Sequence, residues 1–260
     1  MKKIAMLMSA AMVVSSLMVP VSAKTKSLYV LTRFYCESDE KESTHDVRFS
    51  YNKKGLVTKQ VDHVMDQPGS TGIEVDQDTY KYTYKGTKLI KKDADNEYTP
   101  GITKYAYSSN KMTAKSGYED FQSTDTLTLK KNRLVKVVVK ATEDLYNYTD
   151  SYQYNKKGQL TKVIDDGTSI RDRFKYDKKG YATMLYYGDQ DYYQYKITYK
   201  NGLPSVIKAV DNGNKHCTYN FYYKKMKVSA VSAVTDQQYS FLHVKDPKSE
   251  QIYDFRWANS

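Results

Sequence analysis

The sequence is poor in cysteine, proline and tryptophan, and each shortage narrows the choice of fold. It has 2 cysteines, 5 prolines and 1 tryptophan, Trp257, in 260 residues. Two cysteines exclude a disulfide-rich scaffold, in which several bridges take the place of a large core. In an exported protein Cys36 and Cys217 can form one disulfide or remain thiols. A bond would require the first strand to meet a late hairpin.

Long apolar runs are absent after the first 23 residues. The N-terminus has a positive pair, Lys2-Lys3, then the apolar stretch Ile4–Val19 and the small-residue triplet Val21-Ser22-Ala23. This order is typical of a secretory signal peptide. A membrane anchor would need about 20 uninterrupted apolar residues. We therefore expect residues 1–23 to be a signal peptide and residues 24–260 to form a single domain, without a transmembrane segment after cleavage.

The charge is strongly positive. The formal net charge is +11, and removal of Lys2 and Lys3 with the signal peptide leaves +9. In an exported protein, basic charge indicates polyanions of the cell envelope, acidic glycans or surface proteins as partners, rather than nucleic acid. Alternatively, the lysines only keep exposed strand faces soluble. We expect the protein to be secreted, or held at the cell surface or in the periplasm.

Helical periodicity is absent from the exported part, and a turn motif repeats in its place. The phrase YNKKG occurs at residues 51–55 and 154–158, and YDKKG at 176–180. Asn or Asp opens the turn, two lysines occupy its right-handed middle positions, and glycine takes the left-handed position. Alternating apolar residues before and after the phrase predict a β-hairpin.

Weaker copies of this pattern extend along the chain, with successive turns about 22 to 31 residues apart, a spacing typical of repeat architectures. We count about eight hairpins, the last of them turning at Lys224-Lys225, and acidic links between the hairpins that lie at the opposite edge. An open sheet of about sixteen strands is rare. The sequence therefore predicts an all-β antiparallel meander that coils, folds over on itself or closes. The predicted turn residues are Asn52, Gly55, Gly86, Asn155, Gly158, Asp177, Gly180 and Gly202.

The pattern Tyr-x-Tyr-Asn/Asp-x-x-Gly-x-Leu resembles the YD repeats of Rhs proteins, best over residues 152–207 and more weakly over about 49–228. In that family each repeat is a hairpin, and many repeats form a shell around a cargo. The resemblance implies hairpin repeats here as well. The arginine that usually follows the turn glycine is replaced by Leu56, Gln159 and Tyr181, and the repeats are too few to enclose a cargo.

Catalytic and metal-binding motifs are not evident, so no cofactor, metal or catalytic residue is expected. The four histidines are far apart, and His216 beside Cys217 would point to the opposite face of a strand. Paired acids such as Asp165-Asp166 fall in links between hairpins, where turn formation explains them.

The tyrosines offer the best candidate for binding. Tyr187, Tyr193 and Tyr195, with Lys196, could form an aromatic and basic sheet face that stacks on sugar rings or meets a surface polymer. The alternative is that these rings serve packing.

Three functional hypotheses follow. The first is a non-enzymatic protein that binds a cell-surface polymer or partner protein through this Tyr/Lys-rich face. The second is a structural or assembly element of an Rhs-like shell or surface complex. The third is an enzyme or inhibitor with a site in the acidic links.

Overall fold

The computed structural model describes the wall of a β-barrel and a short hairpin. The described residues are 26–38, 43–66, 74–86, 88–95, 101–130, 133–187, 193–201, 203–211, 213–228, 241–243 and 252–254. The signal peptide and the turn glycine Gly202 lie outside these residues.

The first half of the wall consists of β1 (Lys26–Ser38), β2 (Ser43–Tyr51), β3 (Val57–Asp66), β4 (Glu74–Lys85), β5 (Lys88–Asp95), β6 (Gly101–Tyr107), β7 (Lys111–Tyr118) and β8 (Phe121–Lys130). The second half consists of β9 (Arg133–Ala141), β10 (Tyr148–Tyr154), β11 (Leu160–Asp165), β12 (Ser169–Tyr176), β13 (Ala182–Tyr187), β14 (Tyr193–Lys200), β15 (Leu203–Asp211) and β16 (Asn214–Val228), with the 3₁₀ turn η1 (Asp144–Tyr146) after β9. The hairpin β17 (Phe241–His243) and β18 (Ile252–Asp254) forms a separate sheet.

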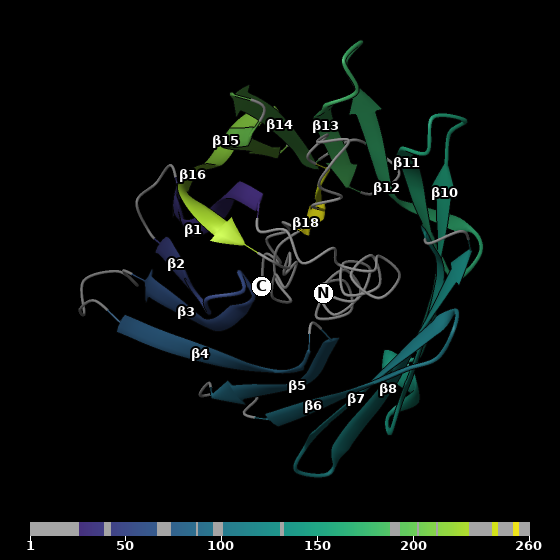
Figure 1. Ribbon diagram of the computed structural model, residues 1–260. Helices are drawn as coiled ribbons and strands as arrows, with labels where there is room; N and C mark the ends of the chain where they lie inside the picture. Colours follow the sequence, from purple (N-terminus) through teal and green to yellow (C-terminus); the bar gives the residue numbers. More distant parts are fainter. Residues whose placement is uncertain are drawn as a thin grey trace.

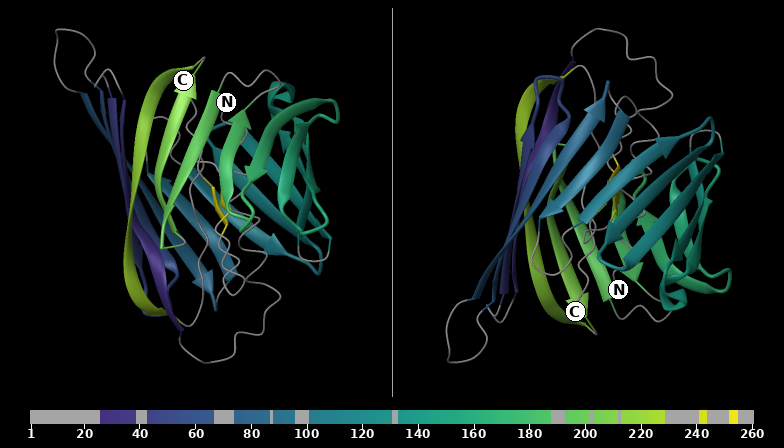
Figure 2. Two further views of the ribbon diagram at one scale, coloured as in Figure 1. Left: turned by 90° about the horizontal axis from the view of Figure 1, so that it is seen from above. Right: turned by 90° about the horizontal axis from the view of Figure 1, so that it is seen from below.

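Each strand of the wall pairs with its neighbours in sequence, and β1 pairs with β16 to close the barrel. Figure 1 looks into this ring of strands, inside which β18 lies, and Figure 2 shows the long strands β1 and β16 side by side. The expected all-β antiparallel meander is confirmed. Of the three expected arrangements, the sheet is closed rather than coiled or folded over.

Closure also corrects one of the predicted hairpins. The expected turn at Lys224-Lys225 is wrong, because β16 continues through it and pairs Lys224 with Val30 and Lys225 with Tyr29. The first strand needs a hydrogen-bonding partner on its open edge, and an uninterrupted β16 supplies one. The acidic stretch from Asp62 to Asp78, which the sequence predicts as one of the links between hairpins, is instead partly strand, since β3 runs to Asp66 and β4 begins at Glu74.

The two faces of the wall differ sharply in polarity. Buried apolar and aromatic residues from along the wall form one cluster, which includes Val47, Leu89, Leu127, Val163 and Tyr219. The alternate positions on the same strands are mostly half-buried or exposed, so the buried face is the inner face. The outer face carries exposed lysines at Lys59, Lys81, Lys104, Lys115, Lys136, Lys140, Lys175, Lys196 and Lys208.

The repeated phrase forms the same local structure each time it occurs. In the second copy the Gly158 amide donates to the Asn155 carbonyl at 2.9 Å, and the Asn155 side chain accepts from the amides of Lys157 and Gln159. Gly158 has a φ of 82°, in the left-handed region that glycine enters without strain. Gly55 and Gly180 have φ values of 92° and 87° in the other two copies.

A bulge follows each of these turns and explains the irregular register of the repeats. The residues Thr58, Thr161 and Thr183 are the extra residues on their strands, where the pairing register shifts. Each threonine hydroxyl donates back to a carbonyl on the partner strand, as Thr161 does to Gln153 at 3.1 Å. The full repeat therefore includes a threonine beyond the glycine.

Candidate functional site: a cationic rim

The connections between strands alternate between the two ends of the barrel. Because the sheet is an antiparallel meander, the turns at 52–56, 155–159 and 177–181 lie at one end, and the connections at 119–120, 142–147 and 166–168 lie at the other. The lysine pairs of the repeated phrase are therefore collected at one end, although they are far apart in sequence.

The side chains at this end form what we call the cationic rim. Its members are exposed lysines in the turns or immediately beside them: Lys53, Lys54, Lys85, Lys111, Lys130, Lys156, Lys157, Lys178, Lys179 and Lys200. Among the described turn residues at this end, Asp177 alone is acidic. Within the described part of the chain, Lys53, Lys54, Lys156, Lys157 and Lys178 form no ion pair.

The turn geometry explains why lysine stands at these positions. The Asn or Asp side chain and the glycine satisfy the backbone of the turn, so the two middle residues contribute no side chain to it. Their side chains extend into solvent, where a charged residue is favourable and a large apolar residue would be exposed.

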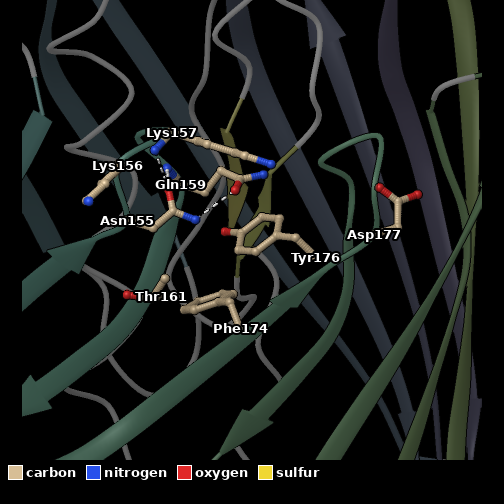
Figure 3. Close-up of a pocket in the computed structure, with 8 residues that line it drawn as sticks. All are labelled: Asn155, Lys156, Lys157, Gln159, Thr161, Phe174, Tyr176 and Asp177. Atoms are coloured by element: carbon tan, nitrogen blue, oxygen red, sulfur yellow. Dashed lines mark hydrogen bonds between the residues drawn. The ribbon is translucent and has the colours of Figure 1, made fainter.

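A pocket opens in this rim between two neighbouring turns (Figure 3). Its volume is about 510 Å³, and it is lined by Asn155, Lys156, Lys157, Gln159, Thr161, Phe174, Tyr176 and Asp177. In Figure 3 Lys156 lies on the Asn155 side, the Lys157 side chain extends above the Tyr176 ring, and the Asp177 carboxylate lies beyond that ring. Ammonium groups beside an aromatic floor can bind an anionic group and stack on a sugar ring.

Hydrogen bonds hold the pocket wall rigid. The Tyr176 hydroxyl donates to the Leu160 carbonyl at 2.7 Å, and the Gln159 side-chain amide donates to the Gly180 carbonyl at 3.3 Å. The second bond joins one turn to the next. Burial raises the pKa of Tyr176 well above its ordinary value, and nearby Tyr199 and Tyr154 add to the shift. The phenol therefore stays neutral and remains a hydrogen-bond donor.

The predicted binding residues are divided between the two faces. Tyr195 is buried on the inner face and Lys196 is exposed on the outer face, so they do not form a single Tyr/Lys surface. Tyr187 and Tyr193 are paired across β13 and β14, and their side chains are not described. The outer-face aromatic residue near Lys196 is Tyr186, which accepts a hydrogen bond from Lys175 at 2.7 Å. Sequence reasoning did not single out the lysines of the turns as a site.

The two cysteines lie on the strands that close the barrel. Cys36 on β1 pairs in register with Tyr219 on β16, two residues from Cys217. Both are buried thiols in this structure. The first strand thus meets a late strand, as a disulfide would require, and whether the pair oxidises stays a prediction.

The inner wall also contains charged groups. Arg171 donates to Asp150 at 2.6 Å and to Asp172 at 3.2 Å, and all three residues are buried. Asp125 is 1% exposed, and neither of its carboxylate oxygens accepts a hydrogen bond from the described residues. Burial raises its pKa to about 7, against the opposing effect of Lys92.

The described residues contain neither a helix that could cross a membrane nor a group of side chains suited to holding a metal ion. The predicted acidic links, including Asp165-Asp166, lie at the end opposite the cationic rim. The shifted carboxyl of Asp125 lies in the wall of β8, not in a link.

The fold belongs to the class of closed, sixteen-stranded antiparallel barrels. Among solved structures the chain is similar to a porin-like protein from Bacteroides uniformis ATCC 8492, with a TM-score of 0.52 and 13% sequence identity. The alignment covers 75% of this chain and 96% of that protein. No protein-family model matches the sequence, and no curated protein matches it significantly. At this identity the likeness concerns the fold alone.

Proposed function

We propose that this protein is an exported, non-enzymatic barrel that binds an anionic polymer of the cell surface through its cationic rim. The observation that carries the proposal is the collection of exposed turn lysines at one end of the barrel. A ring of like charges attracts a multivalent anion more strongly than the same lysines spread over the surface. The pocket beside Tyr176 supplies a place where one anionic or sugar unit of the polymer can be held.

The likeness to a porin-like protein raises a second candidate, a barrel that spans an outer membrane. Membrane barrels need an outward apolar band about 25 Å tall, and each lysine at the bilayer midplane costs about 2–4 kcal/mol. Here the outer face carries exposed lysines on many strands, among them Lys81, Lys104, Lys136 and Lys208. This polarity favours a barrel surrounded by water.

The test compares two variants with equal net charge. In the rim variant Lys53, Lys54, Lys156 and Lys157 become Gln, and in the wall variant Lys104, Lys115, Lys136 and Lys208 become Gln. Retention on immobilised polygalacturonate and on polyphosphate is measured from about 0.1 M to 1 M salt, with neutral dextran as the control matrix.

We expect the wild type and the wall variant to be retained at low salt and released as salt rises. The affinity of the rim variant for the polyanion matrix should be at least tenfold lower. Equal loss in both variants would mean that net charge alone drives retention. Failure of the wild type to bind either polyanion would contradict the proposal. Sedimentation of the detergent-free protein with lipid vesicles would favour the membrane candidate.

A further inference from the structure

From β5 to β12, the described connections at the end opposite the cationic rim carry acidic residues. The exposed acidic residues in or beside these links are Asp95, Glu119, Asp120, Glu143, Asp144 and Asp166. We call this set the acidic rim. Its members come from four neighbouring connections along β5 to β12, and none of them forms an ion pair with a described residue.

Hydrogen bonds hold two of these carboxylates in fixed positions. Asp166 accepts a hydrogen bond from the Thr149 amide at 2.7 Å, and Asp144 accepts one from the Asn147 side chain at 2.8 Å. Glu119 and Asp166 stand at positive φ, 47° and 45°, so each marks a tight link. These hydrogen bonds orient the carboxylates without neutralising them.

The barrel therefore carries opposite charges at its two ends. From this we infer that copies of the protein associate end to end, with the cationic rim of one copy against the acidic rim of the next. The charge complementarity of the two rims selects a second copy of the chain as the partner. A two-fold contact through one end would place like rims together and would be repelled, so the favoured end-to-end contact is head-to-tail.

Head-to-tail contacts that do not close into a ring produce open chains. Such chains would form at low salt and shorten as salt screens the rims, because the screening length falls from about 10 Å at 0.1 M to about 3 Å at 1 M. The inference adds the acidic rim, which plays no part in the proposed polymer binding. A polymer bound at the cationic rim would leave the acidic rim available to a further copy.

The experiment uses sedimentation velocity on the exported form of the protein at several concentrations and salt levels. An acidic-rim variant carries Glu119→Gln, Asp120→Asn, Glu143→Gln and Asp144→Asn. A cationic-rim variant carries Lys53→Gln, Lys54→Gln, Lys156→Gln and Lys157→Gln. The wall variant described above is the matched control, and circular dichroism checks that each variant keeps its β-structure.

We expect the wild type and the wall variant to form species larger than a monomer at low salt, with at least a tenfold loss of association at 1 M salt. Each rim variant alone should be monomeric. An equimolar mixture of the two rim variants should form a dimer and nothing larger, because each variant retains one working rim.

A wild type that is monomeric at low salt would overturn the inference, as would rim variants that still associate alone or a mixture that stays monomeric. The acidic-rim variant should still bind the polyanion matrices. Loss of its self-association without loss of polymer retention would separate this inference from the proposed function.

Discussion

At the scale of single residues, the tyrosine before a turn has a defined structural task. The hydroxyls of Tyr107, Tyr176 and Tyr199 each donate to a backbone carbonyl of the preceding hairpin, at 2.6, 2.7 and 2.8 Å. Neighbouring repeats are therefore joined by side chains as well as by the strand ladder. This accounts for part of the high tyrosine content, 27 residues, without assigning those rings to a ligand.

Replacement of Tyr176 by Phe should lower the free energy of unfolding by about 1–2 kcal/mol, because the Leu160 carbonyl loses its half-buried donor. Urea denaturation would measure the change. Tyr222→Phe is the matched control, since that side chain is 47% exposed and should change stability by less than about 0.5 kcal/mol. Equal effects would show that the hydrogen bond does not join the repeats.

A second prediction at this scale concerns Asp125. Its pKa is about 7 in the folded protein and close to 3.8 when unfolded, so the folded state holds the proton more tightly between these values. The free energy of unfolding should therefore fall as the pH rises from 4 to 7 and stay low above that.

Asp125→Asn removes this titration and should stabilise the protein at pH 8 by on the order of 3 kcal/mol, with little effect at pH 4. Chemical denaturation at the two pH values would measure both changes. A wild type and a variant with parallel pH profiles would contradict the assigned burial of this carboxyl.

At the scale of elements, the repeat is a turn followed by a bulge. The lysine-containing turns could be read from the sequence, because Asn or Asp and Gly have local backbone reasons to stand at fixed positions. The bulge could not be predicted from the sequence, because the hydrogen bond from the Thr161 hydroxyl to the Gln153 carbonyl depends on the register of the partner strand. A threonine follows the glycine by three residues in all three copies of the phrase, and this spacing was the available signal.

Asn155→Ala should destabilise the barrel by about 1–2 kcal/mol, because its side chain accepts hydrogen bonds from the amides of Lys157 and Gln159. Asn155→Asp should be nearly neutral, since Asp177 opens the equivalent turn and accepts from Tyr181 at 2.8 Å. Thermal unfolding of the two variants would compare them directly. Equal destabilisation would mean that the acceptor oxygen is not what holds the turn.

At the scale of the whole molecule, the sequence could not show whether the sheet is open or closed, and the structure shows that it is closed. Local patterns identify hairpins but do not say whether the first strand finds the last, and the same repeats could have continued as an open sheet. The pairing of β1 with β16 excluded the expected final hairpin at Lys224-Lys225. The likeness to YD repeats stays a prediction. β-Hairpins occur both in such repeats and in this closed barrel, so the hairpins do not distinguish the two.

Charge segregation also belongs to this scale. The lysines of the turns and the acids of the links were visible in the sequence, yet their meaning depends on the strict alternation of connections in a closed meander. The predicted face around Tyr195 and Lys196 failed to form for the same kind of reason, because neighbouring residues on a strand point to opposite faces of the wall.

The most direct test of the cationic rim is lysine footprinting by mass spectrometry, with and without a polyanion such as polygalacturonate. Without polymer, we expect the turn lysines and the outer-wall lysines to be acetylated quickly and the buried Lys92 to be protected. With polymer, protection should appear at Lys53, Lys54, Lys156, Lys157 and Lys178, while Lys104, Lys136 and Lys208 keep their rates. Protection spread evenly over the wall, or confined to Lys196 and its neighbours, would contradict the account.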